Sequence, residues 1–250
     1  MVRLRTATLL ILMACTAQAA MTYRTVVTTR NRFKSSPVVQ RITADGNQRR
    51  LTVEHPEEPF SYDVLLSGDG GASVTALNSQ LHTWYTLAKP SVRLSPSIHI
   101  EIVGRTTELR EESGAEPIGA FPVRKFVVQA SYTSLEDYGG TKVNRVHTLT
   151  AMIWTTDKLA RALAFPPLTI TMGEDSIDAD LRQKTATLPG FPIRVITTVA
   201  RAYDGGQPTV EMKSEEVDEV ATIPAPPASL FVRPANYINQ EPIIGGFAKR

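Results

Sequence analysis

The chain has 250 residues, of which 42% are hydrophobic and one, Cys15, is a cysteine, and its formal net charge is +2. This length is sufficient for one or two domains with a hydrophobic core. A single cysteine excludes an intrachain disulfide. The near-neutral charge, without basic patches interleaved with aromatic residues, gives no indication of nucleic-acid binding.

The first residues have the order of features found in a secretion signal. Two arginines precede an uncharged run over residues 6–13, and a small-x-small triplet ends at Ala19, which is the pattern of a signal peptidase site. The apolar run is too short to cross a bilayer, for which roughly 20 residues are needed. We therefore predict a signal peptide over residues 1–19, cleavage between Ala19 and Ala20, and export to the periplasm.

The same segment contains a second processing pattern. Residues 12–15, Leu-Met-Ala-Cys, resemble the lipobox of bacterial lipoprotein signals, in which the cysteine becomes the lipidated first residue. Lipidation at Cys15 would tether the protein in the envelope, and it is the one route by which the sequence predicts membrane association. Soluble release after Ala19 and tethering through Cys15 are therefore two alternatives.

The remainder of the sequence predicts an antiparallel β meander. Runs rich in Val, Ile, Thr and aromatic residues alternate with clusters such as Asp45-Gly46 and Gly139-Gly140, whose residues tolerate the positive φ angles of tight turns. Within residues 126–132 apolar and polar side chains alternate, so that the strand has one dry and one wet face. Strands of this kind suit a curved sheet around a core or cavity. The predicted strands are residues 22–30, 37–44, 48–54, 61–67, 73–77, 81–87, 97–104, 122–132, 143–155, 192–203 and 209–222.

Two short helices are expected between the ninth and tenth predicted strands. A helix over residues 157–164 would be ended by Pro166, because proline cannot continue a helix. A second helix would begin at Asp175 or Ser176, whose side chains suit a helix N-terminus. Both helices can pack on the dry face of the sheet.

Segments in both halves of the chain resemble one superfamily of envelope proteins. Leu65-Leu66-Ser67 before a glycine turn, and Leu77 and Trp84-Tyr85 after it, are similar to the early hairpins of the periplasmic lipoprotein carriers and outer-membrane lipoprotein receptors. The C-terminal half more closely resembles a domain of unknown function of secreted bacterial proteins. Its matching segments are Gly119 with residues 121–126, Ile153-Trp154 with Asp157, residues 190–194, the acidic run 215–219, and Leu230-Phe231 with Pro234 and Tyr237.

The resemblance implies an unclosed β-barrel folded over a hydrophobic cavity and plugged by short helices. In the carriers this cavity receives lipoprotein acyl chains. The arginine that holds the carriers' closed lid is not placed in this sequence and the helical insertions are fewer, so lipid binding is implied only in general. The predicted fold is mainly β: a single curved antiparallel sheet, an unclosed half-barrel, with about two short helices on its concave face. It spans residues 20–237, and a loosely ordered tail is expected over residues 238–250.

No catalytic or metal-binding motif is recognisable. His55, His82, His99 and His147 stand apart from one another, so they lack the spacing of a zinc site, and surface or hydrogen-bonded roles are expected for His99 and His147. The acidic residues 174–180 lack the glycine and the distal glutamate of a calcium loop, and the sequence has no Gly-x-Ser-x-Gly elbow. We predict no catalysis and no metal or cofactor.

The candidate ligand-binding residues are large apolar side chains of predicted strands. Such residues line a cavity in some proteins and form ordinary core in others. Because burial of one methylene is worth roughly 0.8 kcal/mol, an apolar groove can hold an acyl chain without a polar constellation. The candidates are Trp84, Tyr85, Phe126, Val128, Trp154 and Ile196.

The sequence favours an exported envelope protein that binds a lipid or other apolar small molecule non-covalently in a half-barrel cavity. The alternative is an envelope scaffold or protein-interaction module, with envelope proteins as partners and a concave face filled by its own side chains. A hydrolase would need a convergent site that is not visible in the sequence. An open apolar groove would favour the first function, a filled interior the second, and a tight polar cluster at the mouth the third.

Overall fold

The predicted processing sites lie outside the described part of the chain. This applies to the signal peptide, Ala19 and Cys15, and also to the end of the predicted tail at residues 241–250. The residues that the computed structural model describes are 20–31, 35–56, 62–87, 98–203 and 206–240.

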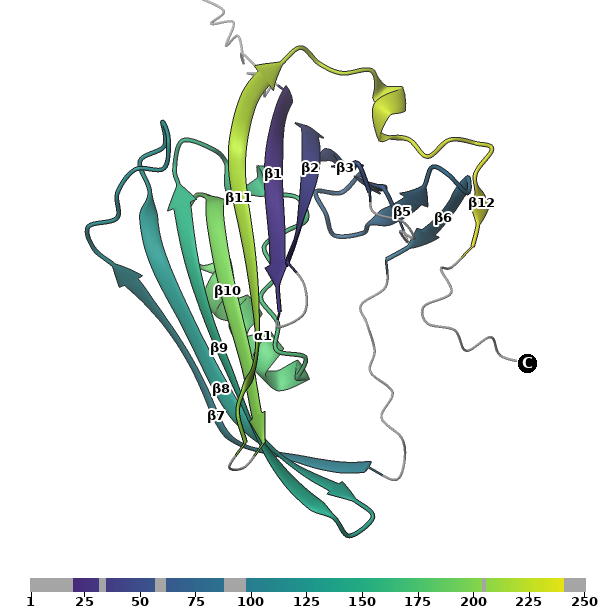
Figure 1. Cartoon of the computed structure of the whole chain (residues 1–250). Helices are drawn as coiled ribbons and strands as arrows, with labels where there is room; N and C mark the ends of the chain where they lie inside the picture. The colour runs from purple at the N-terminus through teal and green to yellow at the C-terminus, as the bar shows by residue number, and fades with distance from the viewer. Residues whose placement is uncertain (1–19, 32–34, 57–61, 88–97, 204–205, 241–250) are drawn as a thin grey trace, which may run out of the picture.

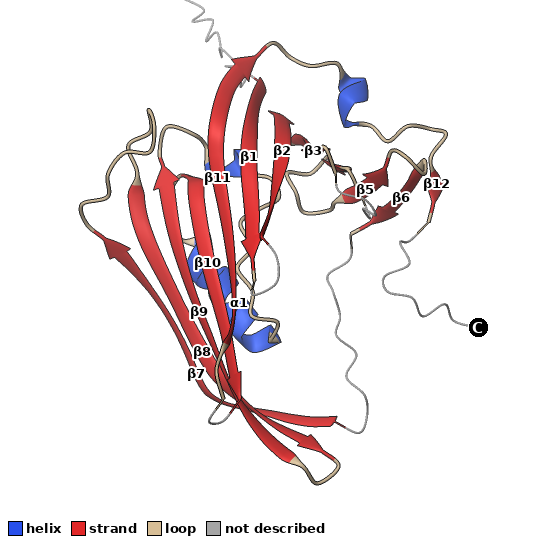
Figure 2. Cartoon of the chain, viewed as in Figure 1, coloured by secondary structure: helices blue, strands red, loops and turns tan. Residues whose placement is uncertain are grey.

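The chain forms one unclosed sheet (Figures 1 and 2). Its strands are β1 (Ala20–Arg30), β2 (Ser35–Asp45), β3 (Gln48–Glu54), β4 (Val64–Ser67), β5 (Thr75–Asn78), β6 (Thr83–Thr86), β7 (Ile98–Glu112), β8 (Arg124–Tyr138), β9 (Lys142–Thr156), β10 (Phe191–Tyr203), β11 (Thr209–Ile223) and β12 (Ile238–Asn239). Their order is β12-β6-β5-β4-β3-β2-β1-β11-β10-β9-β8-β7. The first strand therefore lies inside the sheet, and β7 and β12 are its edges.

The predicted fold class, a mainly β curved and unclosed sheet, is confirmed. Each predicted strand overlaps an observed one, and β7, β8, β9 and β11 have 15 residues each, well above the usual five or six. The start of the predicted tail differs, because β12 pairs with β6 in parallel. The Ile238 and Gln240 amides donate to the carbonyls of His82 and Trp84, each at 2.9 Å. Backbone groups at the edge of β6 thus hold a segment that has no side-chain periodicity.

One of the two predicted helices forms. The α-helix α1 (Asp175–Ala186) begins after Glu174, whose side chain accepts a hydrogen bond from the Ile177 amide at 2.8 Å. The helix predicted over residues 157–164 is wrong: only the 3-10 turn η1 (Arg161–Leu163) is present there. Pro166 leaves too few residues for an α-helix to form its costly first turn and propagate. A second 3-10 turn is η2 (Ala228–Phe231).

The dry faces of the strands form one continuous concave surface. Side chains in direct register across β1 to β6 make a single buried row, and α1 packs on the corresponding face of the longer strands (Figure 2). The N-terminal cluster consists of Met21, Tyr23, Ile42, Ala44, Leu51, Leu65, Ala76, Tyr85, Leu163, Phe165, Phe191, Ile193 and Val217. The helix cluster consists of Phe126, Val128, Ala130, Tyr132, Leu149, Ala151, Ile153, Ile170, Met172, Ile177, Leu181, Leu188 and Val195.

Candidate functional site

An extended segment of the chain covers the concave face between the two clusters. Residues 164–174, which we call the strap, connect η1 to α1 and contain no helix or strand. Phe165 is buried in the N-terminal cluster, and Ile170 and Met172 are buried in the helix cluster. The strap therefore bridges the two halves of the core with its own apolar side chains.

Tyr23 ties the start of the strap to β1. Its hydroxyl donates to the Leu163 carbonyl at 3.0 Å and accepts from the Phe165 amide at 2.8 Å. Burial raises the pKa of Tyr23 above its ordinary value, a change that the hydrogen bond from Phe165 partly opposes. The phenol accordingly keeps its proton and can fill both hydrogen-bonding roles at once.

Arg49 on β3 holds the turn that precedes the strap. Its side chain is 1% exposed, and the guanidinium donates to the carbonyls of Gly46, Gln48 and Ala162 at 2.7, 2.8 and 2.6 Å. Its Nε has no hydrogen-bond partner among the described residues. A buried charge is costly unless it is well hydrogen-bonded, so these carbonyls make the position of η1 specific.

Sequence reasoning missed Arg49, although a signal was present. Along β3, Arg49 is separated by two residues from Leu51 and by four from Val53. Side chains at this spacing share one face of a strand. The alternation therefore placed a lone arginine on the dry face, where it needs buried acceptors.

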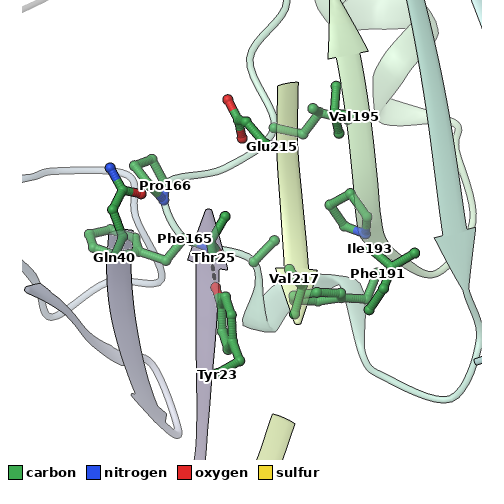
Figure 3. Close-up of a pocket in the computed structure, with 13 residues that line it drawn as sticks. Tyr23, Thr25, Gln40, Phe165, Pro166, Phe191, Ile193, Val195, Glu215 and Val217 are labelled. Atoms are coloured by element: carbon green, nitrogen blue, oxygen red, sulfur yellow. Dashed lines mark hydrogen bonds between the residues drawn. The ribbon is translucent and has the colours of Figure 1, made fainter. Parts of the chain in front are cut away.

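A small hollow lies beneath the strap (Figure 3). Its volume is about 50 Å³, and apolar side chains from β1, β10, β11 and the strap line most of it, with Gln40 and Glu215 adding polar groups. Pockets that hold drug-sized ligands have volumes of roughly 300–1,000 Å³. In this conformation the concave face is thus filled by the protein's own side chains at this point.

A second hollow lies beside the turn that joins β4 and β5. It has a volume of about 120 Å³ and is lined by Leu66, Ser67, Gly68, Ser73, Thr75, Phe231 and Arg233. Leu66 neighbours Leu65 of the N-terminal cluster, so the hollow lies on the opposite face of the sheet. It shares no lining residue with the hollow beneath the strap.

The six predicted ligand-binding residues divide between the two faces. Tyr85 belongs to the N-terminal cluster, and Phe126 and Val128 belong to the helix cluster. The other three each neighbour a residue of those clusters along the same strand, so their side chains point to the opposite face, although Trp154 also packs against the N-terminal cluster. These residues are Trp84, Trp154 and Ile196.

Both tryptophans contact cations on that opposite face. The Arg233 guanidinium lies 4.1 Å from the centre of the Trp84 ring. Trp154 lies between Lys125 and Arg194, at 5.4 and 5.8 Å. The six residues therefore do not line one cavity, and Tyr85, Phe126 and Val128 are the members that share the concave face.

Polar side chains gather on the concave face of β8 and β9, beyond the helix cluster. We call this group the polar cluster. His147 Nε2 lies 3.1 Å from Ser134 Oγ, and Ser134 donates to Glu136 at 2.8 Å. The other contacts to Glu136 come from the Tyr138 hydroxyl and from Arg145 at 3.3 Å. The members are Tyr132, Ser134, Glu136, Tyr138, Arg145 and His147.

The polar cluster differs from a serine-hydrolase triad. In a triad the acid orients the histidine through Nδ1, and the histidine accepts the serine proton. Here the carboxylate contacts Ser134 instead, and His147 Nδ1 is buried with no partner among the described residues. Because the Ser134 hydroxyl donates to Glu136, its proton is not directed at the histidine.

The acidic residues near α1 are occupied by backbone groups. The Glu174 carboxylate accepts a hydrogen bond from the Ile177 amide, and the Asp178 carboxylate accepts one from the Met172 amide at 2.7 Å. Within the described residues no group of three or more potential metal ligands comes together. Among these same residues, no helix is both long and apolar enough to span a bilayer.

Comparison with known proteins leaves the geometry as the basis for function. No family model matches the chain, and no curated protein is significantly similar to it.

Proposed function

We propose that the protein is a non-catalytic, exported envelope protein that binds a lipid or other apolar chain non-covalently on its concave face. The strap carries this proposal, because an extended apolar segment of the chain itself occupies the surface that an acyl chain would need. Phe165, Ile170 and Met172 supply the apolar contacts there. Binding would exchange these side chains for the methylenes of a ligand.

The proposal requires the strap to move. A hollow of about 50 Å³ is too small for an acyl chain, so the conformation described above is the closed state. The strap has no ladder of backbone hydrogen bonds to the sheet. Tyr23 and the Arg49 contact with Ala162 hold its start, and Asp178 of α1 holds its end by accepting from the Met172 and Gly173 amides. A segment held in this way can leave without disrupting a strand.

Chain length should decide whether a ligand can displace the strap. Exposing its three buried apolar side chains costs roughly 1.5–3 kcal/mol each, and each methylene that takes their place recovers roughly 0.8 kcal/mol. About six to eleven methylenes are therefore needed before displacement becomes favourable. Short chains should fail to bind, and long chains should bind.

The test is a titration of the purified protein with hexanoate, decanoate and palmitate, followed by calorimetry and native mass spectrometry. Palmitate is expected to bind and hexanoate is not. Phe165→Ala makes the strap easier to displace, so decanoate should bind this variant more tightly than the unmodified protein. Ile196→Ala, on the opposite face, is the matched control and should leave the chain-length dependence unchanged.

A scaffold with a filled core is the second candidate function. The observation in its favour is the close filling of the concave face, which leaves about 50 Å³ beneath the strap. If palmitate binds neither the unmodified protein nor Phe165→Ala, the lipid-binding proposal is overturned and the scaffold takes its place.

Export is the other part of the proposal. The described fold begins with the buried Ala20 of β1, so cleavage after Ala19 would leave the sheet intact. The intact mass of the protein isolated from its own cell envelope distinguishes the two processing alternatives. A mass that starts at Ala20 indicates soluble release, and a diacylated Cys15 indicates a tether.

A further inference from the structure

The concave face changes from apolar to polar along a single strand. On β8, Phe126, Val128 and Ala130 belong to the helix cluster. Ser134 and Glu136 continue the same face toward the hairpin that joins β8 to β9 and are 3% and 4% exposed. An apolar surface that runs into a buried polar group matches the chemistry of an amphiphile, which has an apolar chain and a polar head.

The end of the strap lies beside the polar cluster. Ile170 and Met172 pack in the helix cluster together with Tyr132. The Tyr132 ring stacks on the His147 ring, with centroids 4.3 Å apart and an interplanar angle of 9°. A chain that replaced the strap would therefore bring its end group to His147.

The hydrogen bonds determine which atom of His147 carries the proton. The Glu136 carboxylate can only accept, so the Ser134 hydroxyl donates to it, and His147 Nε2 must then donate to Ser134. Burial lowers the pKa of His147, and Arg145 and Arg201 lower it further against the opposing effect of Glu136. The imidazole is accordingly neutral, and its unprotonated Nδ1 can accept a hydrogen bond.

Two buried atoms of opposite character lack partners in this cluster. His147 is 7% exposed, and its Nδ1 has no hydrogen-bond partner among the described residues; the same holds for the donor Arg145 Nε. The two residues are two positions apart on β9 and share a face. A hydroxyl group can donate to Nδ1 and accept from Nε–H, and hydroxyl groups are therefore the chemistry that completes the site.

Arg201 adds a cation at the edge of the same site. It pairs directly with His147 across β10 and β9 and is exposed. No hydrogen bond or ion pair joins it to another residue in the described part of the chain. Tyr203, which is 54% exposed, has its ring centre 4.5 Å from the Arg145 guanidinium and accepts a hydrogen bond from Arg145 at 2.8 Å, so an exposed side chain covers this guanidinium.

We infer that the polar cluster and Arg201 bind the head group of the amphiphile, and that this head group carries a phosphate beside free hydroxyl groups. The phosphate pairs with Arg201, and the hydroxyl groups fill the vacant positions at His147 Nδ1 and Arg145 Nε. The inference rests on the proposed function for the apolar chain. It adds a specificity that a purely apolar groove does not have.

The experiment compares dipalmitoyl phosphatidylglycerol, dipalmitoyl phosphatidylcholine, palmitate and glycerol 3-phosphate by native mass spectrometry of the full chain. Phosphatidylcholine is the matched lipid, because it has the same chains and phosphate but no hydroxyl donor. Phosphatidylglycerol is expected to bind at least tenfold more tightly. Arg201→Gln should weaken the binding of both phospholipids, because they share the phosphate, and should leave most of the preference in place. His147→Phe, which lacks the Nδ1 acceptor, should abolish most of the preference, whereas Arg182→Gln, an exposed arginine of α1, should change neither.

The outcomes separate this inference from the proposed function. Equal binding of the two phospholipids, with palmitate binding intact, overturns the head-group site and leaves the apolar-chain function standing. Binding of glycerol 3-phosphate alone that depends on Arg201 supports the phosphate and hydroxyl chemistry and assigns it to a soluble ligand. Failure of palmitate to bind contradicts the proposed function itself.

Discussion

The Phe165 amide donates a hydrogen bond to the Tyr23 hydroxyl at 2.8 Å, which joins the strap to β1 across 142 residues of sequence. The same hydroxyl donates to the Leu163 carbonyl. One buried side chain thus satisfies a carbonyl at the end of η1 and an amide of the strap, which has no regular structure. Buried backbone groups without partners are costly, so this contact largely sets how firmly the concave face is closed.

Tyr23→Phe should weaken the closed state while keeping the aromatic ring. The Leu163 carbonyl and the Phe165 amide lose their partner, which costs roughly 1–3 kcal/mol of unfolding free energy. Palmitate should bind more tightly, by about tenfold for each 1.4 kcal/mol that the strap loses. Urea unfolding and calorimetric titration measure the two effects.

Thr22→Val is the control for this prediction. Thr22 donates to the Ile42 carbonyl at 3.0 Å, so the variant loses a hydrogen bond of the adjacent residue without touching the strap. Its palmitate affinity should equal that of the unmodified protein. An unchanged affinity in Tyr23→Phe would show that the strap does not oppose binding.

Arg49→Met should destabilise the protein strongly. The substitution removes the donor for three carbonyls in a buried site, and hydrogen bonds from charged groups contribute roughly 1.5–3 kcal/mol each. We expect a loss of about 3 kcal/mol or more in unfolding free energy. Arg41→Met is the matched control, because Arg41 makes a partly exposed ion pair with Glu54 at 3.0 Å. Such pairs are worth about 1 kcal/mol or less. Comparable losses of unfolding free energy in the two variants would argue against a special stabilising role for the buried Arg49.

Protonation of His147 should make stability depend on pH. Burial, with Arg145 and Arg201, places its folded-state pKa below the ordinary value of 6.5. The unfolded chain therefore binds this proton at a higher pH than the folded chain. The stabilisation is fully present above about 6.5 and is lost as the pH falls toward the folded-state pKa.

His147→Gln should reduce this slope. Chemical denaturation between about pH 5 and pH 7.5 isolates the histidine, because carboxyl groups titrate mainly below this range. His55→Asn is the control: His55 is exposed, and asparagine tolerates its φ of 52°. A slope that persists unchanged in His147→Gln would contradict the assignment.

Gly190→Ala should be among the most damaging single substitutions. Gly190 has a φ of 68°, and an added Cβ would lie 2.5 Å from the Thr156 carbonyl oxygen. Thr156 ends β9 and Phe191 begins β10, so neither backbone can yield easily. We expect a loss above about 2 kcal/mol, from both strain and overpacking. Gly46→Ala, with a φ of 52° and open space around the Cβ position, should cost roughly 1 kcal/mol, and thermal unfolding measures both.

Local periodicity accounts for the parts of the fold that the sequence predicted well. Alternation of apolar and polar residues identified β8, and β3 was predicted with its observed bounds. The same alternation along β3 also places Arg49 on the dry face. The prediction of a helix over residues 157–164 was wrong, because short segments near prolines take their conformation from tertiary contacts rather than from propensity.

The candidate site was less predictable for a related reason. Trp84 and Tyr85 are neighbours on one strand, so the alternation that places one of them on the concave face excludes the other. Hydrophobicity alone does not rank two such residues. The polar cluster was equally hidden, since Tyr132 and His147 meet only through the register of β8 and β9.

The sequence by itself determined the β class, the positions of the strands and turns, and the one-sided character of each strand, because these depend on interactions among residues close in the chain. Tertiary structure alone decided that the strap fills the concave face and that the Tyr23 hydroxyl accepts a hydrogen bond from the Phe165 amide. It also decided that the unpartnered His147 Nδ1 lies at the end of the apolar surface. Each of these contacts joins strands or loops whose pairing depends on the register of the whole sheet. No local pattern carries that information.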